Sequence, residues 1–101
     1  SSRPRQMIRI TDDCVEVSGP MTLADATALL AAGEAAIAGN ASKFDLAAVT
    51  EMDSSGLAVV FGWTRAARAA GKSIRLLNLP QNLVSLAAVY GVADLLPQHK
   101  L

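Results

Sequence analysis

The chain has 101 residues, and its nine basic residues are balanced by nine acidic ones. This length allows one domain around a single core, and 51% hydrophobic against 18% charged residues is typical of a globular protein. A neutral balance offers no basic field to nucleic acid or anionic lipid, and no apolar run approaches the roughly 20 residues of a membrane span. We therefore expect a soluble cytoplasmic domain that neither binds nucleic acid nor inserts directly into a membrane.

The chain is expected to begin with a hairpin. Alternating segments at Met7–Ile10 and Cys14–Ser18 predict two short strands around a turn at Thr11–Asp13. Gly19-Pro20 is expected to break the second strand. The acidic pair Asp12-Asp13 is interpreted as part of a solvated turn rather than as a metal or acid–base site.

A helix is predicted next. Apolar residues recur at helical spacing over Leu23–Ala38, and Gly39-Asn40 follows as a usual helix end. Thr22 precedes this helix and Asp25 stands three residues later, which is a variant of the capping box. The residues that recur at helical spacing are Leu23, Ala26, Leu30 and Ile37.

The rest of the chain alternates strands with helices. The expected elements are a strand at Lys43–Leu46 that Val49 extends, a helix from Ser54 or Ser55 to Ala70, a strand at Ser73–Leu77, and a helix at Gln81–Gly91 with Pro80 in its first turn. The order β-β-α-β-α-β-α implies crossover connections and a small mixed sheet of about four strands with three helices. We predict one α/β domain over residues 7–97, with residues 1–6 as a leader or cloning remnant and residues 98–101 as a tail.

Several kinds of chemistry lack their residues. The sequence has neither the phosphate-binding loop G-x-x-x-x-G-K-[ST] nor the dinucleotide-binding loop G-x-G-x-x-G, and it has no G-x-S-x-G nucleophile elbow. Its only histidine, His99, lies in the expected tail. One cysteine and one histidine cannot form a zinc site, and Cys14 is interpreted as a partly exposed thiol of no special reactivity. We expect a protein that is not an enzyme and holds no metal or cofactor.

A polar cluster, Asp53-Ser54-Ser55-Gly56, interrupts two apolar segments. An Asp or Ser before a helix accepts hydrogen bonds from the first backbone N–H groups and contributes about 1 kcal/mol. Three capping-type residues in a row exceed that need, and a serine at a helix N-terminus is a suitable phospho-acceptor because the dipole tolerates an anion. The residues leave two interpretations open, a simple cap and a hydroxyl presented for recognition.

The helix that follows is apolar nearly all round in its first turns. Its two apolar stripes are Leu57, Val60, Phe61 and Thr64, and Val59, Trp63, Ala66 and Ala70. Either the other helices cover the second stripe, or the stripe is an exposed surface for a partner. In the second case the small residues Ala58 and Gly62 would let the partner approach closely. Periodicity does not decide between these alternatives.

A family resemblance is carried by FDLAAVTEMDSSGLAVV and by the helix and strand that end in AAGKSIRLLNLP. These segments resemble the STAS domain, named for sulfate transporters and anti-sigma-factor antagonists. In the antagonists a partner kinase phosphorylates the first serine of the motif, which corresponds to Ser54. The resemblance also implies supporting roles for Asp53 beside that serine and for Asp45 near it. The loop Gly19–Thr22 departs from the Gly-x-Leu-Asp loop of antagonists, which weakens the kinase-substrate interpretation.

The C-terminal segment narrows the resemblance. NLPQNLVSLAAVYGVADLLP is similar to the small STAS subunit of the Mla-type phospholipid ABC transporter, which maintains outer-membrane lipid asymmetry in Gram-negative bacteria. This implies a non-enzymatic subunit that binds the cytoplasmic ATPase, and through it the permease complex, and lies peripheral to the inner membrane. The alternative is an anti-sigma-factor antagonist that an anti-sigma serine kinase switches at Ser54.

The docking surface is expected at the head of the second predicted helix. Ser54 and Ser55 would provide hydroxyls, and Gly56 would give a partner clearance. Packing and charge are expected from Leu57, Phe61, Trp63 and Arg65.

Overall fold

The computed structural model describes residues 7–96, so the expected leader and tail lie outside the described residues. Its elements are β1 (Met7–Thr11), β2 (Cys14–Met21), α1 (Leu23–Ala38), β3 (Lys43–Met52), α2 (Ser54–Ala69), β4 (Arg75–Leu77), α3 (Gln81–Val89) and a short 3₁₀ turn, η1 (Ala93–Leu95). The predicted order β-β-α-β-α-β-α is confirmed. Within residues 7–96, no helix is both long and apolar enough to cross a lipid bilayer.

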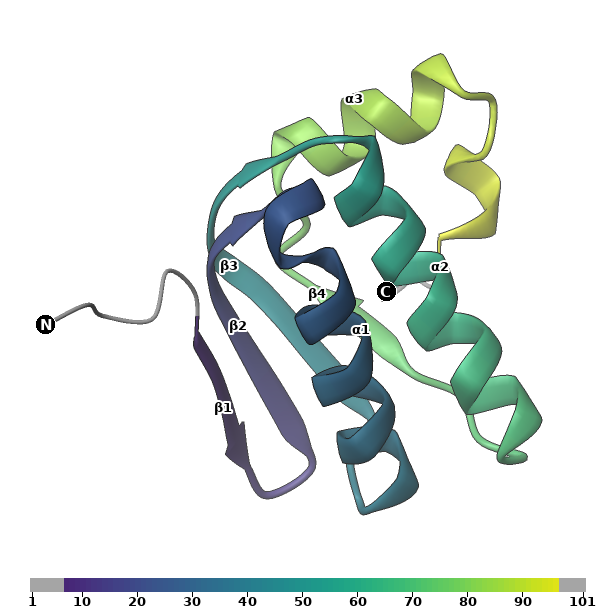
Figure 1. Cartoon of the computed structure of the whole chain (residues 1–101). Coiled ribbons are helices and arrows are strands. Elements are labelled where there is room, and N and C mark those ends of the chain that lie inside the picture. The colour runs from purple at the N-terminus through teal and green to yellow at the C-terminus, as the bar shows by residue number, and fades with distance from the viewer. Residues whose placement is uncertain (1–6, 97–101) are drawn as a thin grey trace, which may run out of the picture.

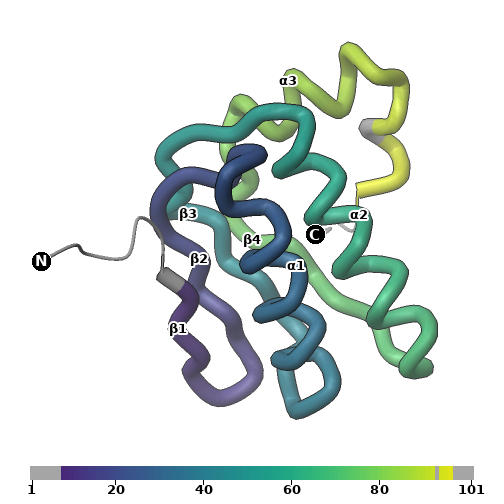
Figure 2. The backbone as a smooth tube through the Cα atoms, in the orientation of Figure 1, coloured from purple at the N-terminus to yellow at the C-terminus, as the bar shows by residue number. Residues whose placement is uncertain are grey.

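The four strands form one mixed sheet in the order β1-β2-β3-β4. β1 and β2 are the antiparallel hairpin that the sequence predicts, whereas β2–β3 and β3–β4 are parallel. α1 and α2 lie side by side on one face of the sheet, and α3 lies beyond the end where β3 leads into α2 (Figures 1 and 2). The opposite face is polar and includes the ion pair Arg9–Glu16 at 3.8 Å.

β2 does not end at Gly19-Pro20, so that prediction is wrong. The strand runs on to Met21 and stays paired with β3 through two register shifts, one of them between Gly19 and Pro20. Gly19 has a φ of 89°, which glycine adopts at little cost. A bulge is also one of the few places where a sheet accepts proline, because the missing N–H leaves no ladder bond broken.

Other bounds differ from the predictions mainly in length. β3 continues beyond Leu46 to Met52 because its second half pairs with β2, while β4 covers only Arg75–Leu77, opposite Lys43–Asp45. α3 ends at Val89 instead of Gly91, and Pro80 occupies its N-cap position rather than its first turn.

The core centres on Trp63 of α2, whose side chain has no exposed area. The indole stacks on Phe44 of β3 with ring centroids 4.5 Å apart, and Nε1 donates to the carbonyl oxygen of Leu29 on α1 at 3.1 Å. A Cβ on Gly33 of α1 would overlap the indole. The second apolar stripe of α2 is therefore buried at Val59 and Trp63, and Trp63 has no surface that a partner could contact.

α1 has the predicted bounds. Leu29, Gly33, Ala36 and Ile37 face the core, whereas Leu23 is 74% exposed. Leu23 lies within about 40° of the buried Ile37 round the helix, so its exposure follows from its position as the first residue of α1 and not from its direction.

Lys72, in the turn after α2, binds the end of α1. Its Nζ donates to the carbonyl oxygens of Ile37 at 2.6 Å and Gly39 at 2.9 Å. A cation is favourable there because the last carbonyl groups of a helix lack intrahelical partners and carry partial negative charge.

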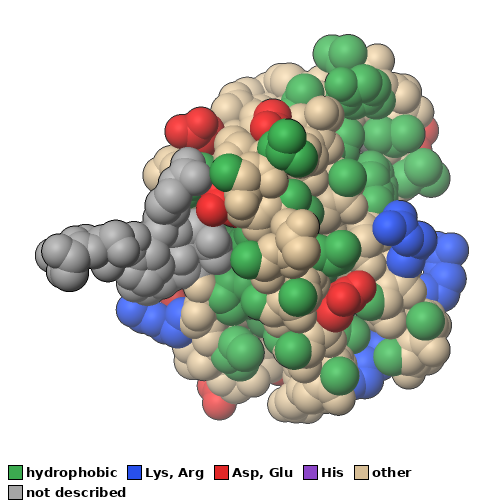
Figure 3. Space-filling model, viewed as in Figure 1, with side chains coloured by type: hydrophobic (Ala, Val, Ile, Leu, Met, Phe, Trp, Pro, Cys, Tyr) green, Lys and Arg blue, Asp and Glu red, His purple; other side chains and the backbone are tan. Residues whose placement is uncertain are grey.

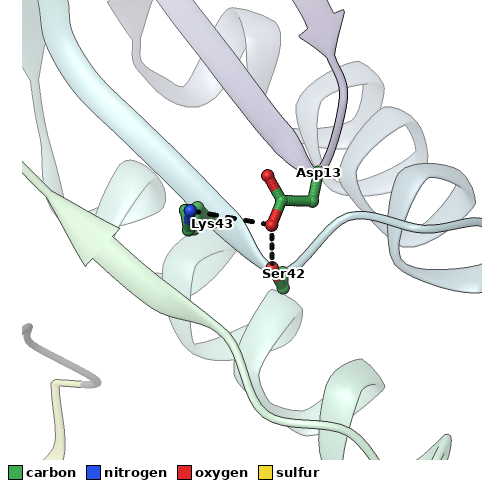
Figure 4. Close-up of polar contacts among 3 residues, drawn as sticks. All are labelled: Asp13, Ser42 and Lys43. Carbon is green, nitrogen blue, oxygen red and sulfur yellow. Dashed lines mark hydrogen bonds and ion pairs between the residues drawn. The ribbon is translucent and has the colours of Figure 1, made fainter.

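The hairpin turn is joined to the loop before β3 at the same end of the sheet (Figure 4). Asp13 Oδ2 accepts a hydrogen bond from Ser42 Oγ at 3.1 Å and lies 3.6 Å from Lys43 Nζ. The hydrogen bond from Ser42, with the charge of Lys43, lowers the pKa of Asp13 below its ordinary value of 3.8 despite some desolvation. Asp12, at φ 55°, forms the turn itself.

This arrangement predicts a pH dependence of stability. Because the folded state lowers the pKa of Asp13, its contribution is present above pH 3.8 and is lost as the pH falls through the folded value. Ser42→Ala removes the largest cause of the shift and should reduce the loss of stability between pH 5 and strongly acidic solution. The measurement is the urea midpoint of the wild type and of Ser42→Ala across this pH range. If the two midpoints fall in parallel as the pH is lowered, the hydrogen bond from Ser42 does not lower the pKa of Asp13.

Candidate partner-binding site

Asp53 is the N-cap of α2, as the capping interpretation of the polar cluster requires. Its backbone is extended, with φ −120° and ψ −170°, and Oδ1 accepts hydrogen bonds from the backbone N–H groups of Ser55 at 2.8 Å and Gly56 at 3.3 Å. These groups are among those that a helix leaves without intrahelical partners. The cap holds the first turn of α2 in place beside the end of β2.

The other oxygen of Asp53 serves a second helix. Oδ2 accepts from the backbone N–H of Leu23, the first residue of α1, at 3.1 Å. Thr22, which the sequence marks as the side-chain cap of α1, makes no such bond, and its hydroxyl instead lies 3.5 Å from Asp25 Oδ2. The predicted capping box is therefore wrong, and one carboxylate binds both helix N-termini.

The two N-termini meet because of the sheet. β2 and β3 are parallel neighbours, and their last residues, Met21 and Met52, are register partners. The helices that follow these strands must start at the same edge. The sequence could have predicted that the two helix N-termini meet, since strands that alternate with helices imply parallel pairing.

Gly56 is buried, and its role is structural. A Cβ at this position would overlap the carbonyl oxygen of Met21 and crowd the side chain of Met52. The missing side chain lets α2 approach the end of β2. The expectation that Gly56 gives clearance to a partner is wrong, because the clearance is used inside the fold.

The expected docking residues divide into exposed and buried ones. Ser54 and Arg65 are exposed, and Ser55 is half-buried. Leu57 and Trp63 face the sheet and belong to the core, so the expectation that they contact a partner is wrong. Phe61 is half-buried against that core.

Asp45 does not lie near Ser54, contrary to the expectation from the family motif. It sits in the first half of β3, where its Oδ1 accepts from Ala47 N and Asn78 Nδ2, both at 3.0 Å. Since β3 continues to Met52 at about 3.3 Å per residue, the two positions are on the order of 20 Å apart. The strand was predicted too short, and this placed its carboxyl end wrongly.

A groove of about 270 Å³ runs between α1 and α2. It is lined by Ala26, Thr27, Leu30, Ser55, Ala58, Val59 and Arg65. Sequence reasoning missed the contribution of α1, because periodicity does not show that Ala26 and Leu30, which pack against the core, also face α2 across a groove. The face that Figure 3 shows carries hydrophobic side chains over these helices, with lysine and arginine at the right-hand edge.

The described residues hold little other reactive chemistry. Within residues 7–96, no three His, Cys, Asp or Glu side chains gather as a metal site would require, and His99 lies outside that range. Cys14 is partly exposed as predicted, and burial, with Asp45 and Glu16 nearby, raises the pKa of its thiol. A raised pKa disfavours the reactive thiolate.

A family model described as "Mlab, STAS domain" matches residues 7–97. The chain belongs to this family of STAS domains. No curated protein matches the chain. The resemblance that the Asp-Ser-Ser-Gly-Leu motif carries is therefore confirmed at the level of the family.

Solved structures with the same fold are anti-sigma factor antagonists. Unphosphorylated SpoIIAA matches with a TM-score of 0.68 and 20% identity, and the match covers 94% of this chain and 88% of that one. Phosphorylated SpoIIAA from Bacillus matches with a TM-score of 0.65 and 20% identity, over 94% of this chain and 91% of that one. A Thermotoga maritima protein assigned as an antagonist has a TM-score of 0.72, 14% identity and coverage of 95% and 86%. An antagonist from Mycobacterium paratuberculosis has a TM-score of 0.65 and 21% identity, and the match covers 95% of this chain and 85% of that one. At these identities the likeness establishes the STAS fold.

The double cap yields a testable contrast between two residues. Asp53→Ala removes the acceptor for three backbone N–H groups and should lower the free energy of unfolding by about 1–2 kcal/mol. Thr22→Ala removes no cap bond and should change the free energy of unfolding by less than about 0.5 kcal/mol. Urea unfolding of both variants is the measurement, and equal losses would show that Asp53 is not the shared cap.

Proposed function

We propose that this STAS domain is a non-enzymatic interaction subunit of an Mla-type phospholipid ABC transporter in a Gram-negative bacterium. It binds the cytoplasmic ATPase, and through it the permease complex, and so lies peripheral to the inner membrane. The observation that carries the proposal is the match of the Mlab family model over residues 7–97. The C-terminal segment that resembles the small Mla subunit lies within this match.

The chemistry at the head of α2 supports recognition rather than catalysis. Both oxygens of Asp53 already accept hydrogen bonds, three in all, from backbone N–H groups. Neither oxygen accepts a hydrogen bond from the hydroxyl of Ser54, as a general base would, and no histidine lies within residues 7–96 to take that role. What remains is an exposed hydroxyl on a rigid helix start, which another protein can bind.

The proposed contact surface joins both helices. Its exposed or half-buried members at the head are Ser54 and Ser55 of α2, with Leu23 and Thr27 of α1, and Phe61 and Arg65 extend it along α2. An apolar residue as exposed as Leu23 beside polar hydroxyls is the mixture that partner surfaces commonly show. The shared cap at Asp53 fixes the two helix starts relative to one another.

We expect the ATPase encoded beside this protein to co-purify with it, and Ser54→Asp to weaken the complex tenfold or more. The new carboxylate would stand beside Asp53 and bring a desolvation cost into the contact. Ser73→Asp, at an exposed position between α2 and β4, is the matched control. Titration calorimetry with the purified ATPase measures the affinity of both variants. An unchanged affinity in Ser54→Asp would show that the head of α2 is not the docking site.

A regulatory switch is the second candidate, because the similar solved structures are anti-sigma factor antagonists and one of them is phosphorylated. The exposure of Ser54 makes its hydroxyl accessible to a kinase. Neighbouring genes for a serine kinase and a sigma factor would favour this function, whereas permease and ATPase genes favour transport.

Incubation with the neighbouring kinase and ATP, followed by intact mass and peptide mapping, tests the switch directly. Under this second function one phosphate is added at Ser54 and none to Ser54→Ala. An unmodified wild-type chain excludes the switch with that kinase.

A further inference from the structure

Arg65 is the charged side chain among the residues that line the groove between α1 and α2. Asp53 lies at the start of α2, and Arg65 lines the groove further along that helix. We propose that this groove receives an amphipathic helix of the partner protein, which inserts one or two aliphatic side chains and sets an acidic side chain against Arg65. The inference rests on the proposed function in taking the head of α2 as a docking surface, and it adds the chemistry of what docks there.

The lining of the groove selects small apolar groups. Ala26 and Leu30 come from α1 and Ala58 and Val59 from α2, with the hydroxyl-bearing Thr27 and Ser55 among them. An apolar cavity of about 150 Å³ holds a benzene ring, so a groove of about 270 Å³ has room for one or two aliphatic side chains. Alanine at 26 and 58 also lets a partner backbone come close.

A helix fits this groove better than an extended strand. The walls are two helices whose backbone N–H and C=O groups are used within each helix, so they offer a strand no ladder of hydrogen bonds. A strand would bury its own N–H and C=O groups unpaired, which costs free energy for each group. A docked helix satisfies its backbone internally and presents side chains at i, i+3 and i+4.

Arg65 is available for a partner charge. Within residues 7–96, neither Arg65 nor Arg68 forms an ion pair, and Glu34, exposed on α1, pairs with neither. The guanidinium of Arg65 lies by Gly62, where a Cβ would be 3.6 Å from Nη2. A guanidinium binds a carboxylate through two parallel hydrogen bonds, so an acidic side chain is the matching partner group.

Arg65 determines where the acidic side chain of the docked helix lies, because it is the charged residue that lines the groove. The partner helix therefore carries its acid on the same face as its aliphatic side chains.

The test uses the full chain and a displayed library of amphipathic helices. The helices share a face of alanine and leucine, and their flanking positions are randomised. We expect selected peptides to be enriched in Asp or Glu at one flanking position, and Arg65→Glu to weaken their binding about tenfold, with a smaller effect at high salt. Arg75→Glu, at an exposed position on β4, is the matched control and should leave affinity unchanged.

A second variant tests insertion into the groove. Ala58→Phe fills it from an exposed position and should abolish binding of the selected peptides, whereas Ala88→Phe, exposed on α3, should not. Circular dichroism checks that each variant is folded. Selected peptides without acidic enrichment, or affinity that Arg65→Glu and Ala58→Phe leave intact, would overturn the proposal.

The ATPase separates the failure of this inference from the failure of the proposed function. An ATPase that does not bind the chain defeats the proposed function and leaves the peptide result standing. An ATPase that binds equally well to wild type and to Arg65→Glu supports the proposed function and defeats this inference.

Discussion

The indole of Trp63 lies where α1, α2 and the sheet meet, and the space that it needs sets the distance between the two helices. It stacks on Phe44, donates to the carbonyl oxygen of Leu29 and occupies the volume that a side chain on Gly33 would take. Because protein interiors are close-packed, neither the ring nor the backbone of α1 can shift far. The groove on the outer side of the helix pair inherits this fixed spacing, since it lies between the same two helices.

The site at the head of α2 is a consequence of parallel strand pairing. β2 and β3 end side by side, so the helices after them start side by side, and their unpaired N–H groups point to a common place. A single carboxylate, Asp53, satisfies groups from both helices. The exposed hydroxyl of Ser54 lies next to this shared cap.

Much of the fold followed from the sequence, because periodicity and punctuation act locally. The bounds of α1 and the hairpin were correct, and the polar cluster does contain the cap of α2. The errors arose where a tertiary contact decides. Periodicity identifies an apolar stripe but not which stripe the sheet covers, so it does not show that Trp63 is buried and Leu23 exposed. The true length of β3 depends on pairing with β2, and this displaced Asp45 from the site.

Lys72 has a consequence for how the far end of the domain opens. Its ammonium group belongs to the turn between α2 and β4, yet its acceptors are the last carbonyl groups of α1. If either turn unfolds locally, the other loses a charged hydrogen-bond partner that water must replace. Lys72 therefore links the local stability of two turns that lie more than thirty residues apart in the chain.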